Sequence, residues 1–143
     1  MLLLTGYLLP FEDGGAIIEV EESLSAIEGE FPSTMSESEI RAAIHSMSHQ
    51  KVITEDDKKW GAPIPLTVER VTRLLDVLDH GVYENKEVNV KILKRWHEND
   101  FSEVAREHNE LWYMDNGNIG YATGIMSAEE EQEYIKVNFD VNE

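Results

Sequence analysis

Apolar residues recur every three or four positions through most of the chain, and this spacing constrains the fold more than any other feature. It is clearest in the stripe Ile40, Ile44 and Met47. Side chains spaced in this way share one face of an α-helix, whereas a half-buried strand alternates at every second residue. Short connections between such helices favour the packing of helix on helix. The sequence therefore predicts an all-α fold, a compact bundle of four to six short helices.

Start and stop signals divide this pattern into separate helices. In the capping-box pattern, a polar residue is followed three positions later by a glutamate. The side chain of each residue accepts a hydrogen bond from the backbone N–H of the other. The pattern occurs at Ser36 with Glu39, at Asp100 with Glu103 and at Ser127 with Glu130. Thr67 can cap a further helix, which Gly81 ends. We expect helices over residues 17–29, 36–51, 67–81, 85–97 and 100–112, and from 127 onward.

Two connections carry further signals. Residues 54–66 contain Gly61, Pro63 and Pro65 and are expected to form a loop that Trp60 pins to the core. Asn116-Gly117 is a favoured hairpin turn, so Tyr113-Met114 could pair with residues 119–123. The sequence thus allows one small β-hairpin near residues 113–123 beside the helices.

The acidic residues are concentrated at the two ends of the chain. The net charge is −17, yet residues 41–126 contribute only −3, with 14 acidic and 11 basic residues. Residues 1–40 hold nine acidic residues and no Lys or Arg. Since nucleic-acid binding needs a basic field, we expect no direct contact with nucleic acid. The acids are interpreted as solubilising ends, with mimicry of a nucleic acid as the alternative.

We divide the chain into residues 1–35, an apolar arm followed by an acidic linker or helix, and residues 36–143, the helical domain. Residues 1–10 are strongly apolar but shorter than the roughly 20 residues of a membrane-spanning helix. They also lack the basic start and cleavage site of a signal peptide. Three interpretations are open: an anchor remnant, the tail of a longer leader, or an arm that packs on this domain or a second copy. The sequence as written predicts a cytoplasmic protein, and a longer leader would make it membrane-anchored or extracytoplasmic.

His45 and His49 are four residues apart on an expected helix, so both imidazoles can reach one metal ion. A third ligand is not evident in the neighbouring sequence, and the glutamate of the zinc-protease motif is missing between them. The pair also lies away from the apolar stripe of its helix, which favours two surface histidines. We therefore predict no metal and no other cofactor, and keep His45 and His49 as weak candidate ligands.

His108 lies within the apolar stripe of the helix expected over residues 100–112. A buried imidazole needs hydrogen-bond partners, and two roles are open for it. One is a general base, and the other is a core histidine that bonds backbone carbonyls in the turn after Trp112. No nucleophile or second catalytic group accompanies it, and the chain has no cysteine. The core role is therefore favoured, and we predict that the protein is not an enzyme.

Residues 117–124 lack the Lys-Ser/Thr pair of a phosphate-binding P-loop, so no nucleotide is expected.

Six short motifs stand out in order along the chain. They are Met47-Ser48-His49-Gln50-Lys51-Val52, Lys59-Trp60-Gly61, Ile92-Leu93-Lys94-Arg95-Trp96, Asp100-Phe101-Ser102, His108-Asn109-Glu110-Leu111-Trp112 and Gly117-Asn118-Ile119-Gly120-Tyr121-Ala122-Thr123-Gly124. Together with the glutamates at 129–131, this series resembles an uncharacterised family of small proteins from bacilli, a domain of unknown function. The likeness covers about residues 36–136.

The resemblance implies a membrane-spanning or signal-like segment, then an acidic linker, then this domain, and residues 11–35 look like that linker. It implies no catalytic residue. It also implies one structural or binding unit made of His49, Trp60, Trp96, His108, Asn109 and Trp112.

We therefore predict a non-enzymatic bacterial interaction domain, associated with the cell envelope if the resemblance extends to the anchor. It would bind a protein partner or a second copy of itself. The candidate groove consists of Trp60, Trp96, His108, Asn109 and Trp112. Two alternatives stay open: an acidic inhibitor that acts on another protein as a nucleic-acid mimic, and a small enzyme that depends on a metal or on histidine.

Overall fold

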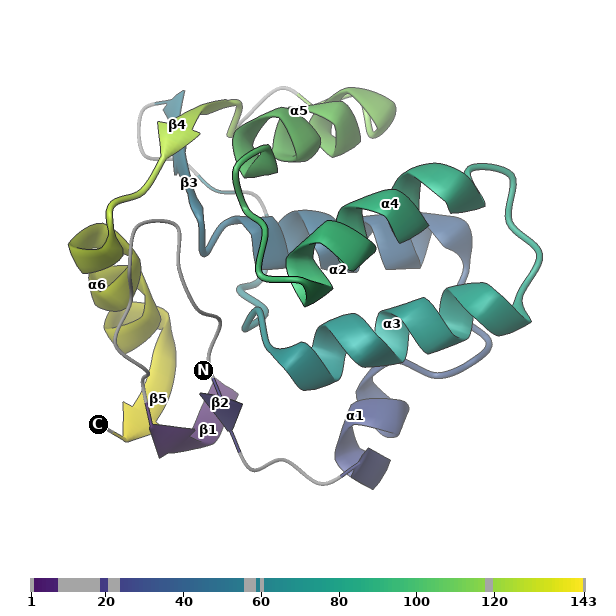
Figure 1. Ribbon diagram of the computed structural model, residues 1–143, viewed down its shortest axis with the longest axis horizontal. Coiled ribbons are helices and arrows are strands. Elements are labelled where there is room, and N and C mark those ends of the chain that lie inside the picture. The colour runs from purple at the N-terminus through teal and green to yellow at the C-terminus, as the bar shows by residue number, and fades with distance from the viewer. Residues whose placement is uncertain are drawn as a thin grey trace.

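The computed structural model describes residues 2–7, 19–20, 24–55, 59, 61–117 and 120–142. The helices within these ranges are α1 (Leu24–Glu30), α2 (Glu37–Ser48), α3 (Val68–His80), α4 (Lys86–His97), α5 (Val104–Met114) and α6 (Ala128–Asn138). The strands are β1 (Leu2–Tyr7), β2 (Glu19–Val20), β3 (Val52–Thr54), β4 (Ala122–Ile125) and β5 (Phe139–Asn142). The mostly helical, compact fold predicted from the sequence is confirmed (Figure 1).

The central helix is α2, which contacts both α4 and α5 (Figure 1). It begins at the predicted capping box, in which Ser36 and Glu39 each cap the other's backbone N–H. Its predicted apolar face, Ile40, Ile44 and Met47, is completely buried. Burial of this face on neighbouring helices, rather than helix propensity alone, stabilises a helix of this length.

Helices α3 and α4 form an antiparallel pair, and α4 lies in front of α2 (Figure 1). The Thr67 hydroxyl caps α3 by accepting a hydrogen bond from the backbone N–H of Arg70, and Gly81 ends the helix, both as predicted. The side chains that join this pair to the core share the helical spacing read from the sequence. They are Val71, Leu74 and Leu78 from α3, and Ile92, Leu93 and Trp96 from α4.

Residues ahead of the expected domain boundary pack into the same core. Ile27, Phe31 and Met35 are buried with the residues of α2 and α3. Glu30 of α1 also lies 3.0 Å from the guanidinium of Arg70 on α3. The boundary at residue 35 stays a prediction, but residues 24–35 are packed against the helical body.

The expected helix over residues 17–29 is only partly formed. It begins at Leu24, and residues 19–20 form strand β2 instead, because Val20 pairs with Gly6 of β1. On its other side β1 pairs in parallel with β5, with Leu2 opposite Phe139. This small sheet brings the two ends of the chain together (Figure 1).

The hairpin expected near residues 113–123 is not formed, because Tyr113-Met114 completes α5. Asn116 has a φ of 53° and Gly117 donates its N–H to the carbonyl of Trp112, which together make a helix-ending Schellman motif. A side-chain carbon on Gly117 would lie 2.6 Å from the Trp112 ring. Asn116-Gly117 is therefore a helix stop rather than a hairpin turn.

Helix α4 ends in the same way, and this corrects a second expectation. Asn99 has a φ of 61°, and Asp100 donates its N–H to the carbonyl of Arg95. The Asp100 carboxylate then accepts hydrogen bonds from the backbone and hydroxyl of Ser102. Asp100 therefore closes α4 and shapes the following turn, and α5 begins only at Val104.

The small two-stranded sheet pairs β4 with β3, in antiparallel register with Val52 opposite Ile125. It follows that residues 122–125 pair with a segment some 70 positions earlier in the chain. The predicted capping box of Ser127 and Glu130 then starts α6.

Candidate metal centre

The last turn of α2 carries two histidines on one face. His45 lies in the helix and His49 is its C-cap, with a helical φ of −58° and ψ of −24°, so their four-residue spacing aligns the two imidazoles. The ring centroids are 5.1 Å apart. Exposed fractions of 3% for His45 and 1% for His49 show that the expected surface position is wrong. Helix α5 packs against α2 and buries the pair.

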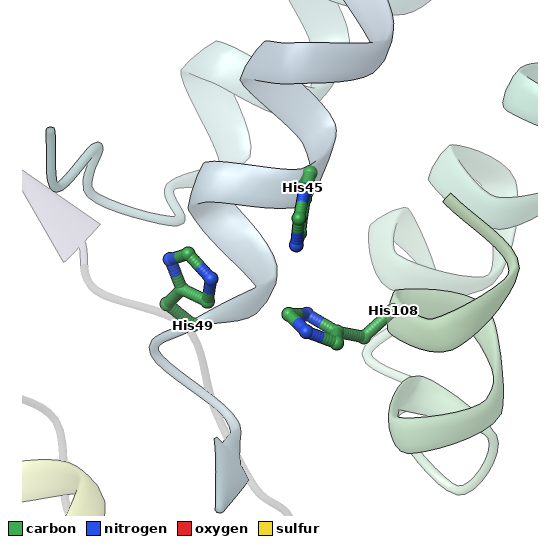
Figure 2. Close-up of side chains that lie close together, drawn as sticks. All are labelled: His45, His49 and His108. Carbon is green, nitrogen blue, oxygen red and sulfur yellow. The ribbon is translucent and has the colours of Figure 1, made fainter. Parts of the chain in front are cut away.

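A third histidine comes from α5. His108 is completely buried, and its ring centroid lies 4.5 Å from that of His45 and 5.2 Å from that of His49. Figure 2 shows His45 and His49 projecting from α2, and His108 projecting from α5, toward the same space. One potential ligand atom of each residue lies within 4.8 Å of those of the other two. A third candidate ligand, which the sequence around α2 did not reveal, thus comes from another helix.

Two short hydrogen bonds fix the His108 ring. Nε2 lies 2.7 Å from the carbonyl oxygen of Gly120, and since a carbonyl only accepts, Nε2 carries the proton of the neutral ring. Nδ1 is then an acceptor and lies 2.6 Å from the Ser48 hydroxyl oxygen. The second nitrogen of a metal-binding histidine commonly donates to a backbone carbonyl in this manner.

The Ser48 hydroxyl can exchange its hydrogen bond to Nδ1 of His108 for one to a backbone carbonyl. Its hydroxyl oxygen lies 2.5 Å from the carbonyl oxygen of His45 as well as 2.6 Å from Nδ1 of His108. One hydroxyl has one proton to donate and here has two acceptors within reach. If an ion took Nδ1, Ser48 could donate to the His45 carbonyl, and neither group would be left unpaired.

The segment that follows α5 is held in place by α5 itself. Gly120, whose φ of 88° favours glycine, presents the carbonyl that accepts from His108. The Asn109 side chain accepts from the N–H of Ala122 at 2.8 Å and donates to its carbonyl at 3.0 Å. We predicted that His108 bonds a backbone carbonyl in the turn after Trp112. Its Nε2 atom makes this bond, while its Nδ1 atom faces the cluster.

The surroundings keep all three imidazoles uncharged at neutral pH. Burial, together with the neighbouring His108, His45 and Lys59, lowers the pKa of His49 to about 2. Burial lowers the pKa of His108 to about 4, although its bond to Gly120 acts in the opposite direction. For His45, burial lowers the pKa and Asp115 raises it. Metal binding requires neutral imidazole, so this donor set has no protons to lose first.

The donors and distances suit a transition metal ion. Imidazole nitrogens bind Zn, Cu, Fe and Ni, and a tetrahedral site with bonds of about 2.0–2.1 Å would space its nitrogens by about 3.4 Å. The candidate ligand atoms lie within 4.8 Å of one another, so the side chains would have to move closer together to bind an ion in that geometry. The C-terminal end of α2 adds the negative pole of the helix dipole, which favours a cation.

His49 also has a nitrogen that a ligand would satisfy. Its Nε2 is buried and has no hydrogen-bond partner within the described part of the chain. An unpaired polar atom in the interior costs free energy, on the order of 1–3 kcal/mol. A metal ion held by the cluster would remove that cost.

Trp96 and Trp112 of the predicted groove pack against side chains outside the histidine cluster. Trp96 is completely buried, and its Nε1 donates to Glu107 at 3.0 Å, so its indole cannot line a groove. Trp112 packs edge to face on Tyr113 and Tyr121.

Trp60, the remaining member of the predicted groove, lies outside the described residues. Of the five predicted residues, His108 is therefore the one that the structure places in the cluster, with Asn109 beside it.

A family model described as a family of unknown function, DUF6241, matches residues 44–136. The chain belongs to this family. The residues matched to DUF6241 include all three histidines of the cluster. Membership in DUF6241 supplies no activity, and the bacillus origin and membrane anchor implied by the resemblance stay predictions.

No curated protein and no solved structure matches the chain. Across the described residues, the helices are all too short or too polar to cross a bilayer.

Proposed function

We propose that this chain is a metal-binding helical domain that holds one transition metal ion between His45, His49 and His108. The observation that supports this most directly is the convergence of three buried imidazoles from two helices, with ligand atoms within 4.8 Å of one another. The unpartnered Nε2 of His49 and the replaceable hydrogen bond at Nδ1 of His108 support it further.

The position of the cluster favours a stabilising role over a catalytic one. Catalytic zinc sites keep a coordination position open to water and substrate, whereas all three histidines here are at most 3% exposed. An ion bound to them would link the end of α2 to α5. Because binding to the folded state alone stabilises it, the domain would become more stable as the metal concentration rises. This function agrees with our prediction that the protein is not an enzyme.

Metal titration of the full chain tests the proposal. After treatment with a chelator, the protein should bind one Zn²⁺ or Cu⁺ per chain by calorimetry or competition with a chromophoric chelator. X-ray absorption of the loaded wild-type protein should show three imidazole nitrogens at about 2.0 Å. This second measurement needs no variant and therefore does not depend on whether a variant folds.

The chain offers its own control, since its two other histidines are exposed. The variant H80A/H97A should bind metal like the wild type, because His80 and His97 lie on the surfaces of α3 and α4. The variants H49A and H108A, checked for folding by circular dichroism, should lose most of the affinity. Retention of metal by both of them, or a coordination shell of oxygen atoms, would refute the site.

A second candidate function, binding of a protein partner, is supported by an apolar groove away from the histidines. The groove has a volume of about 450 Å³ and lies where β3 and α6 meet. Val137 and Ile53 line it and are 63% and 37% exposed. Apolar side chains left exposed around a groove are typical of interaction sites.

The simplest partner to test is a second copy of the chain. Analytical ultracentrifugation should then show dimers that V137E abolishes, while E129Q, which changes an exposed glutamate of α6 outside the groove lining, leaves them intact. A monomer at every concentration would remove self-association from consideration.

A further inference from the structure

Within the described residues, the histidine cluster contains no negatively charged ligand, and this limits the ions that it can hold well. The group of potential ligand atoms consists of three imidazoles, and the chain has no cysteine that could supply a thiolate. Neutral ligands leave the charge of a bound ion uncompensated. A divalent ion would therefore bring two net positive charges into the site, and a monovalent ion would bring one.

Burial makes that difference large. His45, His49 and His108 are 3%, 1% and 0% exposed, so the ion would lie in a medium of low polarity. The cost of moving an ion out of water rises with the square of its charge, so a dication is penalised about four times as strongly as a monocation of similar size. Zn(II) sites in proteins usually offset this with thiolate, carboxylate or hydroxide ligands.

Within the described residues, charged side chains of both signs act on the cluster. Asp115 acts on His45 with a negative charge, and its Oδ1 also lies 2.6 Å from Nε of Arg41. Lys59 acts on both His49 and His108 with a positive charge. The positive charge of Lys59 penalises a dication more than a monocation at His49 and His108.

Coordination number points in the same direction. Zn(II) in proteins is almost always four-coordinate, and Cu(II) prefers a tetragonal arrangement. The cluster offers three nitrogens, which is a complete shell for trigonal Cu(I). Ser48 is the polar group next to His108 Nδ1, and as a neutral hydroxyl it would not supply the missing charge.

Building on the metal-binding function proposed above, we propose that the ion held by His45, His49 and His108 is Cu(I), and that the uncharged, buried donor set selects it over Zn(II).

Competition titrations of the full chain under anaerobic conditions test this selection. Cu(I) would be supplied with a Cu(I)-specific chromophoric chelator, and Zn(II) with a zinc chelator of known affinity. We expect Cu(I) to bind at least about 100-fold more tightly than Zn(II). Equal or tighter binding of Zn(II) through the three histidines would overturn the selection and leave the metal-binding function standing. Failure of both ions to bind would overturn the two together.

A variant that changes one charge tests whether electrostatics causes the preference for Cu(I) over Zn(II). The variant K59Q removes the positive charge that acts on His49 and His108. Because Coulomb energy is proportional to the charge of the ion, the fold-increase in Zn(II) affinity should be about the square of that for Cu(I). The control K94Q removes an exposed lysine on α4 and should change neither affinity. An equal fold-change for the two ions in K59Q, or the same response in K94Q, would overturn the electrostatic basis of the selection.

Discussion

Lys51 and Glu131 form an ion pair in the interior of the protein, with Nζ 2.9 Å from Oε1 and side chains that are 1% and 3% exposed. The amide of Gln50 donates to the other carboxylate oxygen at 3.3 Å, and the ring of Phe101 lies 4.2 Å from the ammonium. Burial lowers the pKa of Lys51 and raises the pKa of Glu131, while their mutual attraction opposes both shifts. The pair connects the segment after α2 to α6, and each charge depends on the other.

Removing one member of this pair should be more harmful than removing both. In E131Q the ammonium of Lys51 stays buried without its counter-charge, and we expect a loss of about 3–5 kcal/mol in the free energy of unfolding. In the double variant K51M/E131L both charges are replaced by apolar groups, and the loss should be much smaller. Urea denaturation of the three proteins measures the difference.

E133Q, an exposed glutamate on the same helix, is the matched control, and it should change the free energy of unfolding by less than about 0.5 kcal/mol. A double variant that is as unstable as E131Q would show that the contacts of these side chains, and not their charges, stabilise the site.

The hydroxyl of Ser48 should matter less when metal is bound. In S48A without metal, Nδ1 of His108 loses its partner in the interior, and we expect a loss of about 1–3 kcal/mol. With metal bound, the ion occupies Nδ1 and the loss should shrink. Thermal denaturation with and without the ion should therefore show a larger metal-induced stabilisation in S48A than in the wild type.

S46A is the matched control for this comparison, because Ser46 is also buried on α2. Metal should stabilise S46A and the wild type to the same extent. An equal metal-induced stabilisation in S48A would mean that the ion does not bind through Nδ1.

Asn109 ties α5 to β4 through one donor and one acceptor, so its two variants should differ. N109A removes both bonds to Ala122 and should cost about 1–3 kcal/mol. In N109D the carboxylate still accepts from the N–H of Ala122 but cannot donate to its carbonyl. Hydrogen exchange should therefore show the Ala122 amide protected in N109D and exposed in N109A. Equal protection in both variants would mean that the strand, and not Asn109, holds this amide.

The sequence predicted the helices well where signals are local. The capping boxes at Ser36 and Ser127 and the cap at Thr67 involve residues three apart, so a single sequence contains the complete signal. The turn at Asn116-Gly117 was misread because the same dipeptide serves a hairpin and a helix stop. Only the end of α5 at Met114 distinguishes the two.

The histidine cluster was missed for a different reason. The sequence identified His45 and His49 by their spacing and His108 by its apolar surroundings, but it gave no sign that α5 packs across the last turn of α2. A cluster assembled from two helices depends on tertiary packing, which no local pattern encodes. The burial of His45 and His49 is likewise a consequence of α5, since both lie away from the Ile40, Ile44 and Met47 face of their own helix.

Tyr134 provides a test of the packing of α6 at high pH. Burial raises the pKa of its phenol to about 12 from an ordinary value of 10.0. Since the pKa is higher in the folded state, the contribution of Tyr134 to stability is fully present below pH 10 and is lost as the pH rises through about 12. Absorbance at 295 nm should show a late tyrosine titration near pH 12 that Y134F removes, and Y134F should also flatten the loss of stability above pH 10. Y113F, which changes a tyrosine that is 64% exposed, should leave the late titration in place. If Y134F keeps the late component, α6 does not shield this phenol from water.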